Sequence, residues 1–530
     1  MAERPVEPPP VPPGERAPRL KAVDRPPIRL RAIDPERRVA EDHPGRAIWE
    51  LLGQMDLRRF SAGRKAVEGR PGRDACDPRV IMALWLYALR RGVREARALD
   101  EWSPYEPGCP WRLGLERINY HTLADFVTAH AVALEQRFVP VLQALMAAGA
   151  ADLQRVAHDG TKIRAAASRK SFKRQERLAE CRRWAEEHLR AVQQQPPGQW
   201  AEARRRAQQR AARERHERVQ QAQQELQRQQ AGKPPAEQAP VKASVTDAEA
   251  RLLRQGDGGF APSSNAQIST DSTAGVIVGY DASPAKEESH ELSPALARIA
   301  ANTRRAPAQT LVDGGCTTRE NIMATATGAT ARIGSRGESR SHAKLQRRGV
   351  SPEFFPQPFR YDAVADAYTC PAGKLLPDKN RKPWVGGMEK HYPAKARDGG
   401  DGPFRAPCCP RTKYGRRVIR LDEHPRVAAF REKMQQPEYQ GVYRQRAQVA
   451  EFSNAWLKVK RGLRQFLRRG LHKVRAELAW ACLSCNIAIW IRRVWKISLP
   501  VATERRCLGT RRRAPKEQQR ARNKHERNVN

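Results

Sequence analysis

Two short runs of β-forming residues, each ending in an Asp-Gly pair, constrain the fold of this chain more than any other feature. The first run ends at Asp159-Gly160 and the second at Asp313-Gly314. Two further β-type runs, 265–270 and 276–280, are joined by turn residues and read as a hairpin, and Leu292, Leu296 and Ile299 then follow at helical spacing. The order strand, hairpin, helix, strand predicts an open α/β sheet, in which ligands gather at the carboxyl ends of strands.

The first Asp-Gly pair allows two interpretations. Taken alone, Asp159-Gly160 is most simply a hairpin turn. Alternatively, the strand ends at Asp159, Gly160 turns the backbone sharply, and the carboxylate at the strand end reaches a metal ion. Asp313 at a second strand end and Glu451 on a basic helix favour the second interpretation, because two-metal phosphodiester chemistry needs such a set of acids.

Two other acids compete with Asp313 for this role. Asp271 lies in the turn of the predicted hairpin, and Asp281 lies just past the end of a strand. Because of these positions, both rank below Asp313.

The charge of the chain predicts a polyanionic partner. The 530 residues carry a net charge of +40, which is far more than solubility requires, and DNA or RNA is the default partner of such a chain. The first residues lack the apolar core of a signal peptide, and no apolar run reaches transmembrane length. The ten cysteines are scattered and predict reduced thiols in a cytosolic protein.

Shifts in composition divide the chain into a core and the segments that precede, interrupt and follow it. We expect a disordered Pro-rich arm at 1–40, an N-terminal helical domain at 41–148, a core formed by 149–170, 258–335 and 439–498, a charged helical insertion at 171–257, a Cys-containing insertion at 336–438 and a basic disordered tail at 499–530.

For three of these segments, the sequence is compatible with two structural interpretations. In the N-terminal domain, Asp77-Pro78 opens a helix that Arg90 to Gly92 close, and short helices of this kind fit either a helix-turn-helix-like DNA-binding module or a bundle that packs against the core. The Gln/Arg-rich insertion either lies along a nucleic-acid backbone or is a solvated helical hairpin. The Cys-containing insertion lacks paired Cys-x-x-Cys spacing, which favours a small β-rich subdomain over a zinc site.

The helix near the C-terminus presents an acid beside bases. Glu451 and Lys458 are seven residues apart, so on an α-helix they share one face, separated by about 20°. An ordinary solvated edge of an amphipathic helix would show the same pattern, and only the two upstream aspartates favour a site.

Taken together, these motifs resemble the DDE transposases of bacterial insertion sequences, over roughly residues 40–495. The resemblance rests on their order and number: Asp77-Pro, Tyr87-Ala-Leu, His158-Asp-Gly-Thr-Lys162, Thr246-Asp-Ala-Glu-Ala-Arg251, Asp257-Gly-Gly-Phe260, Asn265-Ala-Gln267, Val312-Asp-Gly-Gly315, Cys370-Pro-Ala-Gly373, the helix with Tyr443, Arg446, Glu451 and Lys458, and Arg469-Gly-Leu-His-Lys473. It implies a ribonuclease H-like catalytic core interrupted by two insertions, preceded by an all-α helix-turn-helix-like domain.

The resemblance also implies the roles of individual residues. Asp159, Asp313 and Glu451 are expected to hold two Mg²⁺ ions, for which Mn²⁺ can substitute, and to catalyse the reaction. Contacts to DNA are expected from Tyr443, Arg446, Lys458, Lys162 and Arg464.

The implied activity is strand cleavage at the ends of an insertion element, followed by strand transfer. Double-stranded DNA, both element ends and target, is the expected partner of a homodimer in the cytoplasm, associated with the nucleoid and not with a membrane. Two alternatives remain open from the sequence: a ribonuclease H-like nuclease or resolvase without strand transfer, and a catalytically inactive DNA-binding protein.

Overall fold

The computed structural model describes most of the chain between residues 34 and 496. Not described are 1–33, 497–530 and, between these ends, 62–73, 114–115, 195–201, 286–287, 326–327, 336–337, 385–386, 395–403, 411–414 and 423. The predicted disordered tail at 499–530 and nearly all of the predicted Pro-rich arm at 1–40 therefore lie outside the described residues.

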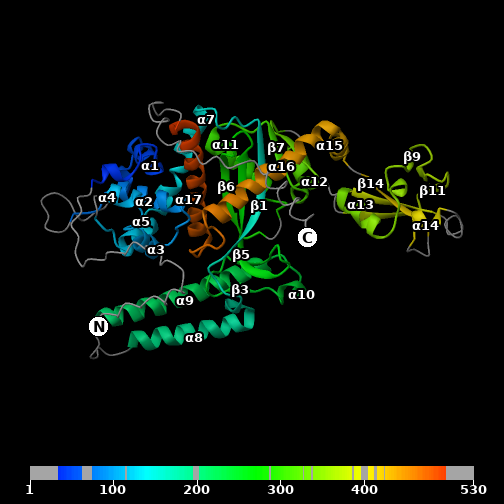
Figure 1. Ribbon diagram of the computed structural model, residues 1–530. Helices are drawn as coiled ribbons and strands as arrows, with labels where there is room; N and C mark the ends of the chain where they lie inside the picture. Colours follow the sequence, from blue (N-terminus) through cyan, green and yellow to red (C-terminus); the bar gives the residue numbers. More distant parts are fainter. Residues whose placement is uncertain are drawn as a thin grey trace, which may run out of the picture.

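A six-stranded mixed sheet forms the centre of the molecule (Figure 1). Its strands are β1 (Arg155–Arg164), β4 (Arg251–Arg254), β5 (Phe260–Asp271), β6 (Ile277–Ser283), β7 (Gln309–Val312) and β8 (Ala331–Gly334). Neighbouring strands follow the order β4-β5-β1-β7-β8. β4 pairs with residues 260–263 of β5, and β6 pairs with residues 265–270 of the same strand. The predicted α/β fold and the order strand, hairpin, helix, strand are confirmed.

The direction of the strands divides the sheet into two halves. β5 is antiparallel to β1 along its length, and β6 is antiparallel to β5. β7 and β8 run parallel to β1, and α11 (Leu292–Thr303) makes the connection from β6 to β7.

One prediction about β1 is wrong. The strand does not end at Asp159, because it continues through Gly160 to Arg164 and pairs with β5 over this whole stretch. Asp159 therefore lies in the middle of a strand. The pairing of β1 with β7 does end near Asp159, because Ala157 is the last residue of β1 that pairs with β7.

Helices cover both faces of the sheet. Side chains alternate between faces along a strand, so Asp159 and His158 point to opposite sides. Asp159 meets α16 (Pro437–Ala455), which crosses the sheet diagonally in Figure 1. His158 lines a small cavity together with Pro294 and Arg298 of α11.

The helix α17 (Leu471–Trp490) joins the sheet to the N-terminal helices. It contacts β6 on one side and α2, α6 and α7 on another. Its Asn486 bonds both polar groups of one β6 residue: the Ile277 N–H donates to Oδ1 at 2.9 Å, and Nδ2 donates to the Ile277 carbonyl at 2.8 Å. α17 is thus a core helix that satisfies the outer edge of the sheet.

The same helix is long and apolar enough to cross a membrane, together with the turn that follows it. Within Leu471–Trp495, 89% of the apolar window is buried inside the protein. No other helix of the described residues has this length and composition. A helix that is buried to this extent inside the protein has the character of a core helix.

The N-terminal part is entirely helical where it is described. Its helices are α1 (Pro44–Gly53), α2 (Pro78–Arg90), α3 (Ala96–Trp102), α4 (Gly108–Leu113), α5 (Tyr120–Ala129), α6 (Ala131–Glu135) and α7 (Phe138–Ala147). Asp77 caps α2 by accepting from the Arg79 N–H at 2.8 Å, and Pro78 occupies the first turn, where no N–H is needed. The packing on α17 means that these helices share one core with the sheet.

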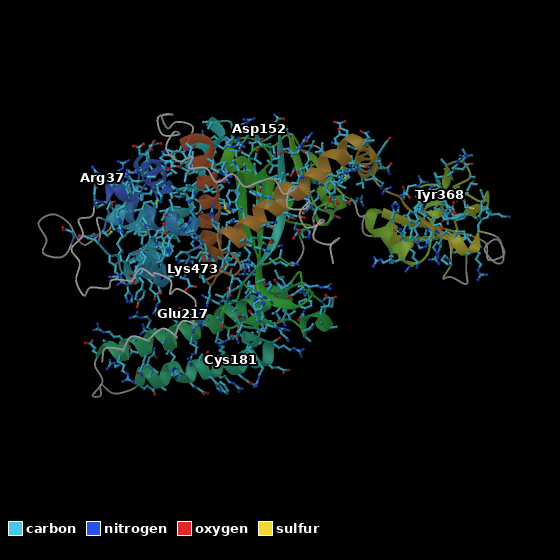
Figure 2. All side chains as sticks on the ribbon, in the orientation of Figure 1. Arg37, Asp152, Cys181, Glu217, Tyr368 and Lys473 are labelled. Carbon is cyan, nitrogen blue, oxygen red and sulfur yellow. The ribbon has the colours of Figure 1, made fainter. Side chains whose placement is uncertain are left out.

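The charged segment between β1 and β4 forms a helical hairpin that projects from the sheet (Figure 1). α8 (Gln175–Gln194) and α9 (Glu202–Gln230) lie side by side, and Figure 2 marks Cys181 and Glu217 on the two helices. The short elements β2 (Phe172–Lys173), β3 (Ala243–Ser244) and α10 (Pro235–Gln238) complete its base. A buried ion pair between Arg251 of β4 and Glu225 of α9 fastens the hairpin to the sheet.

The Cys-containing segment builds two small antiparallel sheets away from the central one (Figures 1 and 2). Their strands are β9 (Arg360–Asp362), β10 (Ala367–Thr369) and β11 (Leu375–Pro377), and β12 (Asn380–Trp384), β13 (Gly387–Pro393) and β14 (Arg417–Asp422). α13 (Glu338–Arg347) and α14 (Arg405–Cys408) lie beside these sheets (Figure 1). α12 (Arg319–Thr325) instead contacts β8 and α11, and α15 (Pro425–Gln435) contacts α12 and α16. Among the described residues, these cysteines belong to no group of metal-binding side chains.

Candidate active site

The register of the parallel strands brings Asp159 and Asp313 to the same level of the sheet. Ala157 of β1 pairs with Leu311 of β7, and each aspartate lies two residues further along its own strand direction. Asp313 directly follows β7 and caps the short helical turn Gly314–Cys316, accepting from the Cys316 N–H at 3.0 Å. The two acids thus meet where the pairing of β1 with β7 ends.

Two side chains of α16 hold the Asp159 carboxylate. Arg446 Nη2 donates to Oδ1 at 2.7 Å, and Asn454 Nδ2 donates to Oδ2 at 2.8 Å. The ion pair is shielded, since the side chains of Arg446 and Asp159 are 17% and 19% exposed. Burial raises the pKa of Asp159, the Arg446 charge opposes this shift, and Asp313 and Glu451 add to it.

Glu451 lies on the same helix between Arg446 and Asn454. Its side chain is exposed, and its charge reaches Asp159 closely enough to raise the pKa of that group. Lys458 lies beyond the end of α16, in the π-helical turn Trp456–Lys460. The predicted angle of about 20° between Glu451 and Lys458 assumed an uninterrupted α-helix and therefore does not apply. Burial lowers the pKa of Lys458 and the nearby Asp159 charge opposes the shift, so Lys458 still belongs to this group of charges.

Glu288 is a member of the site that the sequence analysis missed. It lies in the connection from β6 to α11, outside any helix or strand. Its carboxylate packs over Gly160 of β1: a Cβ atom at Gly160 would lie only 2.5 Å from Glu288 Oε1. Burial raises the pKa of Glu288 to about 7, and the charges of Asp313 and Asp159 contribute to the rise.

Among the described residues, one group of three or more side chains has the spacing of a metal site. Its members are Glu288, Asp313 and Cys316, whose ligand atoms all lie within 4.8 Å of one another. The Cys316 thiol points to the Glu288 carbonyl oxygen at 3.4 Å, and burial raises its pKa. The carboxyl groups of Glu288 and Asp313 are the hard oxygen donors of this group.

The other residues predicted to form the site lie at different distances from it. Lys162, on β1, is close enough to Glu288 to lower its pKa. Tyr443 is partly buried and packs on the sheet core beside Ala157. Arg464 is exposed, and its carbonyl bonds the far end of β1 at Arg164, five residues or about 16 Å along the strand from Asp159. The structure thus brings Lys162 to the acids and does not bring Arg464.

The carboxylates of Asp271 and Asp281 have partners away from the cluster of acids. Asp271 is fully buried and accepts from the backbone N–H groups of Leu153 and Thr273, both at 2.9 Å. Asp281 forms ion pairs with Arg298 and Arg475, both at 2.5 Å. Each carboxylate therefore stabilises a local structure away from the cluster of acids.

Comparison with protein families identifies part of the chain. A family model described as "Transposase DDE domain" matches residues 369–490. This stretch is similar to a transposase DDE domain. The resemblance to DDE transposases is thereby confirmed. No curated protein and no solved structure matches the chain.

The matched stretch contains α16, the π-helical turn and α17, and with them Glu451, Arg446 and Lys458. Asp159, Asp313 and Glu288 lie outside it. The register of β1 and β7 and the bonds from α16 are therefore what join the upstream acids to the helix of the DDE domain.

The raised pKa of Glu288 predicts how pH affects the metal-free protein. Because the pKa is about 7 in the folded chain and 4.5 for an ordinary glutamate, the folded state binds more protons than the unfolded state between these values. The stability that Glu288 contributes is therefore lost as pH rises through this interval. In EDTA, we expect the melting temperature of Glu288→Gln to exceed that of the wild type by an amount that grows from pH 4.5 to pH 8. A difference that is the same at both pH values would contradict the shift.

Proposed function

We propose that this chain is a transposase that binds the ends of its element, cleaves DNA strands there and transfers the free ends into target DNA. The observation that carries the proposal is the convergence of Asp159, Asp313 and Glu451, two of them from the sheet and one from a helix of the DDE domain. The chain thereby joins acids from distant parts of the sequence at one place.

The strand order supports a ribonuclease H-like core. Across the sheet the order is β6-β5-β1-β7-β8, with β5 and β6 forming the hairpin after β1 and α11 leading to β7. On this proposal, residues 171–257 and 336–438 are insertions into the core, and 41–148 form a DNA-binding domain. The hairpin of α8 and α9 and the two small sheets occupy these segments.

On this proposal, the three acids hold two divalent ions. Asp159, Asp313 and Glu451 offer carboxylate oxygens, which are the ligands that Mg²⁺ and Mn²⁺ prefer. The pKa of Asp159 is raised by burial and by the neighbouring acids, so cations there would relieve a repulsion that the folded chain otherwise carries. When bound, the ions activate the attacking water or 3′-hydroxyl and stabilise the leaving oxygen.

The bases beside the acids position the substrate. Arg446 is held by Asp159 at 2.7 Å and presents the rest of its guanidinium beside the acids, where it can also donate to a phosphate oxygen. Lys458 and Lys162 lie near the Asp159 and Glu288 carboxylates, respectively, and attract the DNA backbone. Asn454 fixes the orientation of the Asp159 carboxylate through Oδ2.

The proposed partner is DNA, and the proposed location is the cytoplasm. The net charge of +40 suits contacts with both element ends and target DNA. Two element ends have to be processed together, which calls for a homodimer on DNA. The chain would act in the cytoplasm, on DNA of the nucleoid.

The test is cleavage of a labelled duplex that carries the flanking end of the element. We expect the full-length chain to cut at the end in Mg²⁺, to bind without cutting in EDTA, and to join the cut end to a plasmid target. Cutting without joining would identify a nuclease or resolvase. Binding that is unaffected by metal, with no nicking under any condition, would identify an inactive DNA-binding protein and overturn the proposal.

A further inference from the structure

Glu288 stands on the opposite side of β1 from Asp159 but at the same level. Along a strand, residues 158, 160 and 162 share one face, and the Glu288 carboxylate packs over the middle one, Gly160. Asp159 points to the other face, towards α16. Asp313, at the end of β7, is the acid common to both sides, since its charge raises the pKa of Asp159 and that of Glu288.

Gly160 leaves the space that this arrangement needs. A Cβ atom at this position would lie 2.5 Å from Glu288 Oε1 and 2.8 Å from Gln267 Nε2, both far below contact distance. Gly160 sits inside a regular strand, where glycine has no conformational task and weakens the pairing. The absence of a side chain at residue 160 therefore serves the close approach of Glu288 to β1.

Two buried amide side chains lie beneath Glu288. Gln267 is 3% exposed and Asn265 is fully buried. Asn265 lies close enough to the Glu288 carboxylate to lower its pKa, and Gln267 lies close enough to His158 to raise the pKa of that imidazole. Gln267 Nε2 and Glu288 Oε1 both lie within 2.8 Å of where a Cβ atom at Gly160 would be, so the space around the carboxylate is lined by polar groups that can also bind a hydrated ion.

We propose that Glu288 is a fourth carboxylate of the metal site and binds, together with Asp313, a divalent cation on the α11 side of β1. This inference rests on the proposed function, because it assigns one more ligand to the same metal centre. The ligand atoms of Glu288 and Asp313 lie within 4.8 Å of each other, which is a span that one ion bridges with two bonds of 2.0–2.6 Å, about the Mg²⁺ to Ca²⁺ range.

Cys316 is near this cation but does not bind it. Its thiol points to the Glu288 carbonyl oxygen at 3.4 Å, with which it forms a hydrogen bond. Hard cations also prefer oxygen to sulfur. The two carboxylates therefore suit Mg²⁺ or Mn²⁺.

The experiment is calorimetric titration of the full-length, metal-free chain with Mn²⁺, in the absence of DNA. We expect Glu288→Gln to weaken Mn²⁺ binding by about tenfold or more, because even groups that only support a ligand change metal affinity by about 10–100-fold. The matched control is Glu291→Gln, the same substitution three residues on, where the carboxylate accepts from Ser283 Oγ at 2.5 Å. This control should bind Mn²⁺ as the wild type does.

A second measurement separates ligand loss from misfolding. Without metal, Glu288→Gln should melt above the wild type at pH 8, since the variant removes a carboxylate whose oxygen lies within 4.8 Å of Asp313. With saturating Mn²⁺, the gain in melting temperature should be smaller than in the wild type. A variant that melts below the wild type without metal would overturn the inference.

The titration also distinguishes the inference from the proposed function. If Asp159→Asn weakens Mn²⁺ binding and Glu288→Gln does not, the three-acid site stands and the fourth ligand is wrong. If the wild type shows no saturable Mn²⁺ binding, with DNA or without it, the proposed function itself fails.

Discussion

Asp159→Asn should abolish strand cleavage while leaving DNA binding in place. Asparagine keeps the size of the side chain and an oxygen that can accept from Arg446 or Asn454, which now hold the two carboxylate oxygens at 2.7 and 2.8 Å. What the variant loses is the negative charge that holds a cation. A metal ion stabilises the transition state by several kcal/mol, and each 1.36 kcal/mol is about tenfold in rate, so we expect a loss of about 10³-fold or more.

The measurement is single-turnover cleavage of the end duplex in Mg²⁺, with binding followed by gel shift in Ca²⁺. Asp152→Asn is the matched control, since Asp152 is an exposed aspartate seven residues upstream whose carboxylate accepts from the Gln154 N–H at 2.8 Å. The control should cut at the rate of the wild type. If Asp159→Asn also does so, the acids of the sheet are not the catalytic centre.

Asp313→Asn and Glu451→Gln should also abolish strand cleavage while leaving DNA binding in place, as Asp159→Asn does. Residues that act as one unit give effects that do not add, so a double variant should cut no more slowly than the single ones. Asp271→Asn provides the contrast: the loss there should be in stability, because the Asp271 carboxylate holds the Leu153 and Thr273 N–H groups.

The two strand acids could be predicted from the sequence because strands and their order follow from local patterns. Apolar β-type runs end near Asp159 and at Asp313, and a hairpin and a helix between them leave few ways to connect the strands. The pairing of Ala157 with Leu311 then fixes the level of both acids. The position of a residue in the fold can therefore be predicted from sequence when that position is set by the strand to which the residue belongs.

Glu288 and Asn454 could not be predicted because their places depend on tertiary packing. Glu288 lies in a connection with no periodic pattern, and only the folded chain brings it over Gly160. For Asn454 there was a weak signal: it lies three residues, or one helical turn, after Glu451, so the two side chains project near each other.

The error at Gly160 has a physical reason. An Asp-Gly pair is a strong local turn signal, but nine consecutive residues of β1 pair with β5, from Val156 to Arg164. The free energy of this long-range pairing overrides the local preference of one glycine. Glycine in a strand also marks a close approach of another group, which is the meaning that applies here, since Glu288 lies over it.

Asn486→Leu should destabilise the whole fold. The Asn486 side chain accepts from the Ile277 N–H and donates to the Ile277 carbonyl, at 2.9 and 2.8 Å. Both residues are buried, with Asn486 fully so. Leucine has a similar volume but leaves two buried backbone groups without partners. At about 1–3 kcal/mol for each group, the loss is about 2–6 kcal/mol of the free energy of unfolding, which is a large part of what a domain has.

The measurement is urea unfolding followed by tryptophan fluorescence, with Ser484→Ala as the matched control. Ser484 lies two residues earlier on α17, is buried, and its hydroxyl has no hydrogen-bond partner among the described residues. Removing that hydroxyl should change the midpoint little or raise it, because no bond is lost and a desolvated polar atom disappears. Equal midpoints for Asn486→Leu and the wild type would mean that the edge of β6 finds other partners. A large loss confined to Asn486→Leu would mean that α17 stabilises the sheet through this one side chain, in addition to apolar packing.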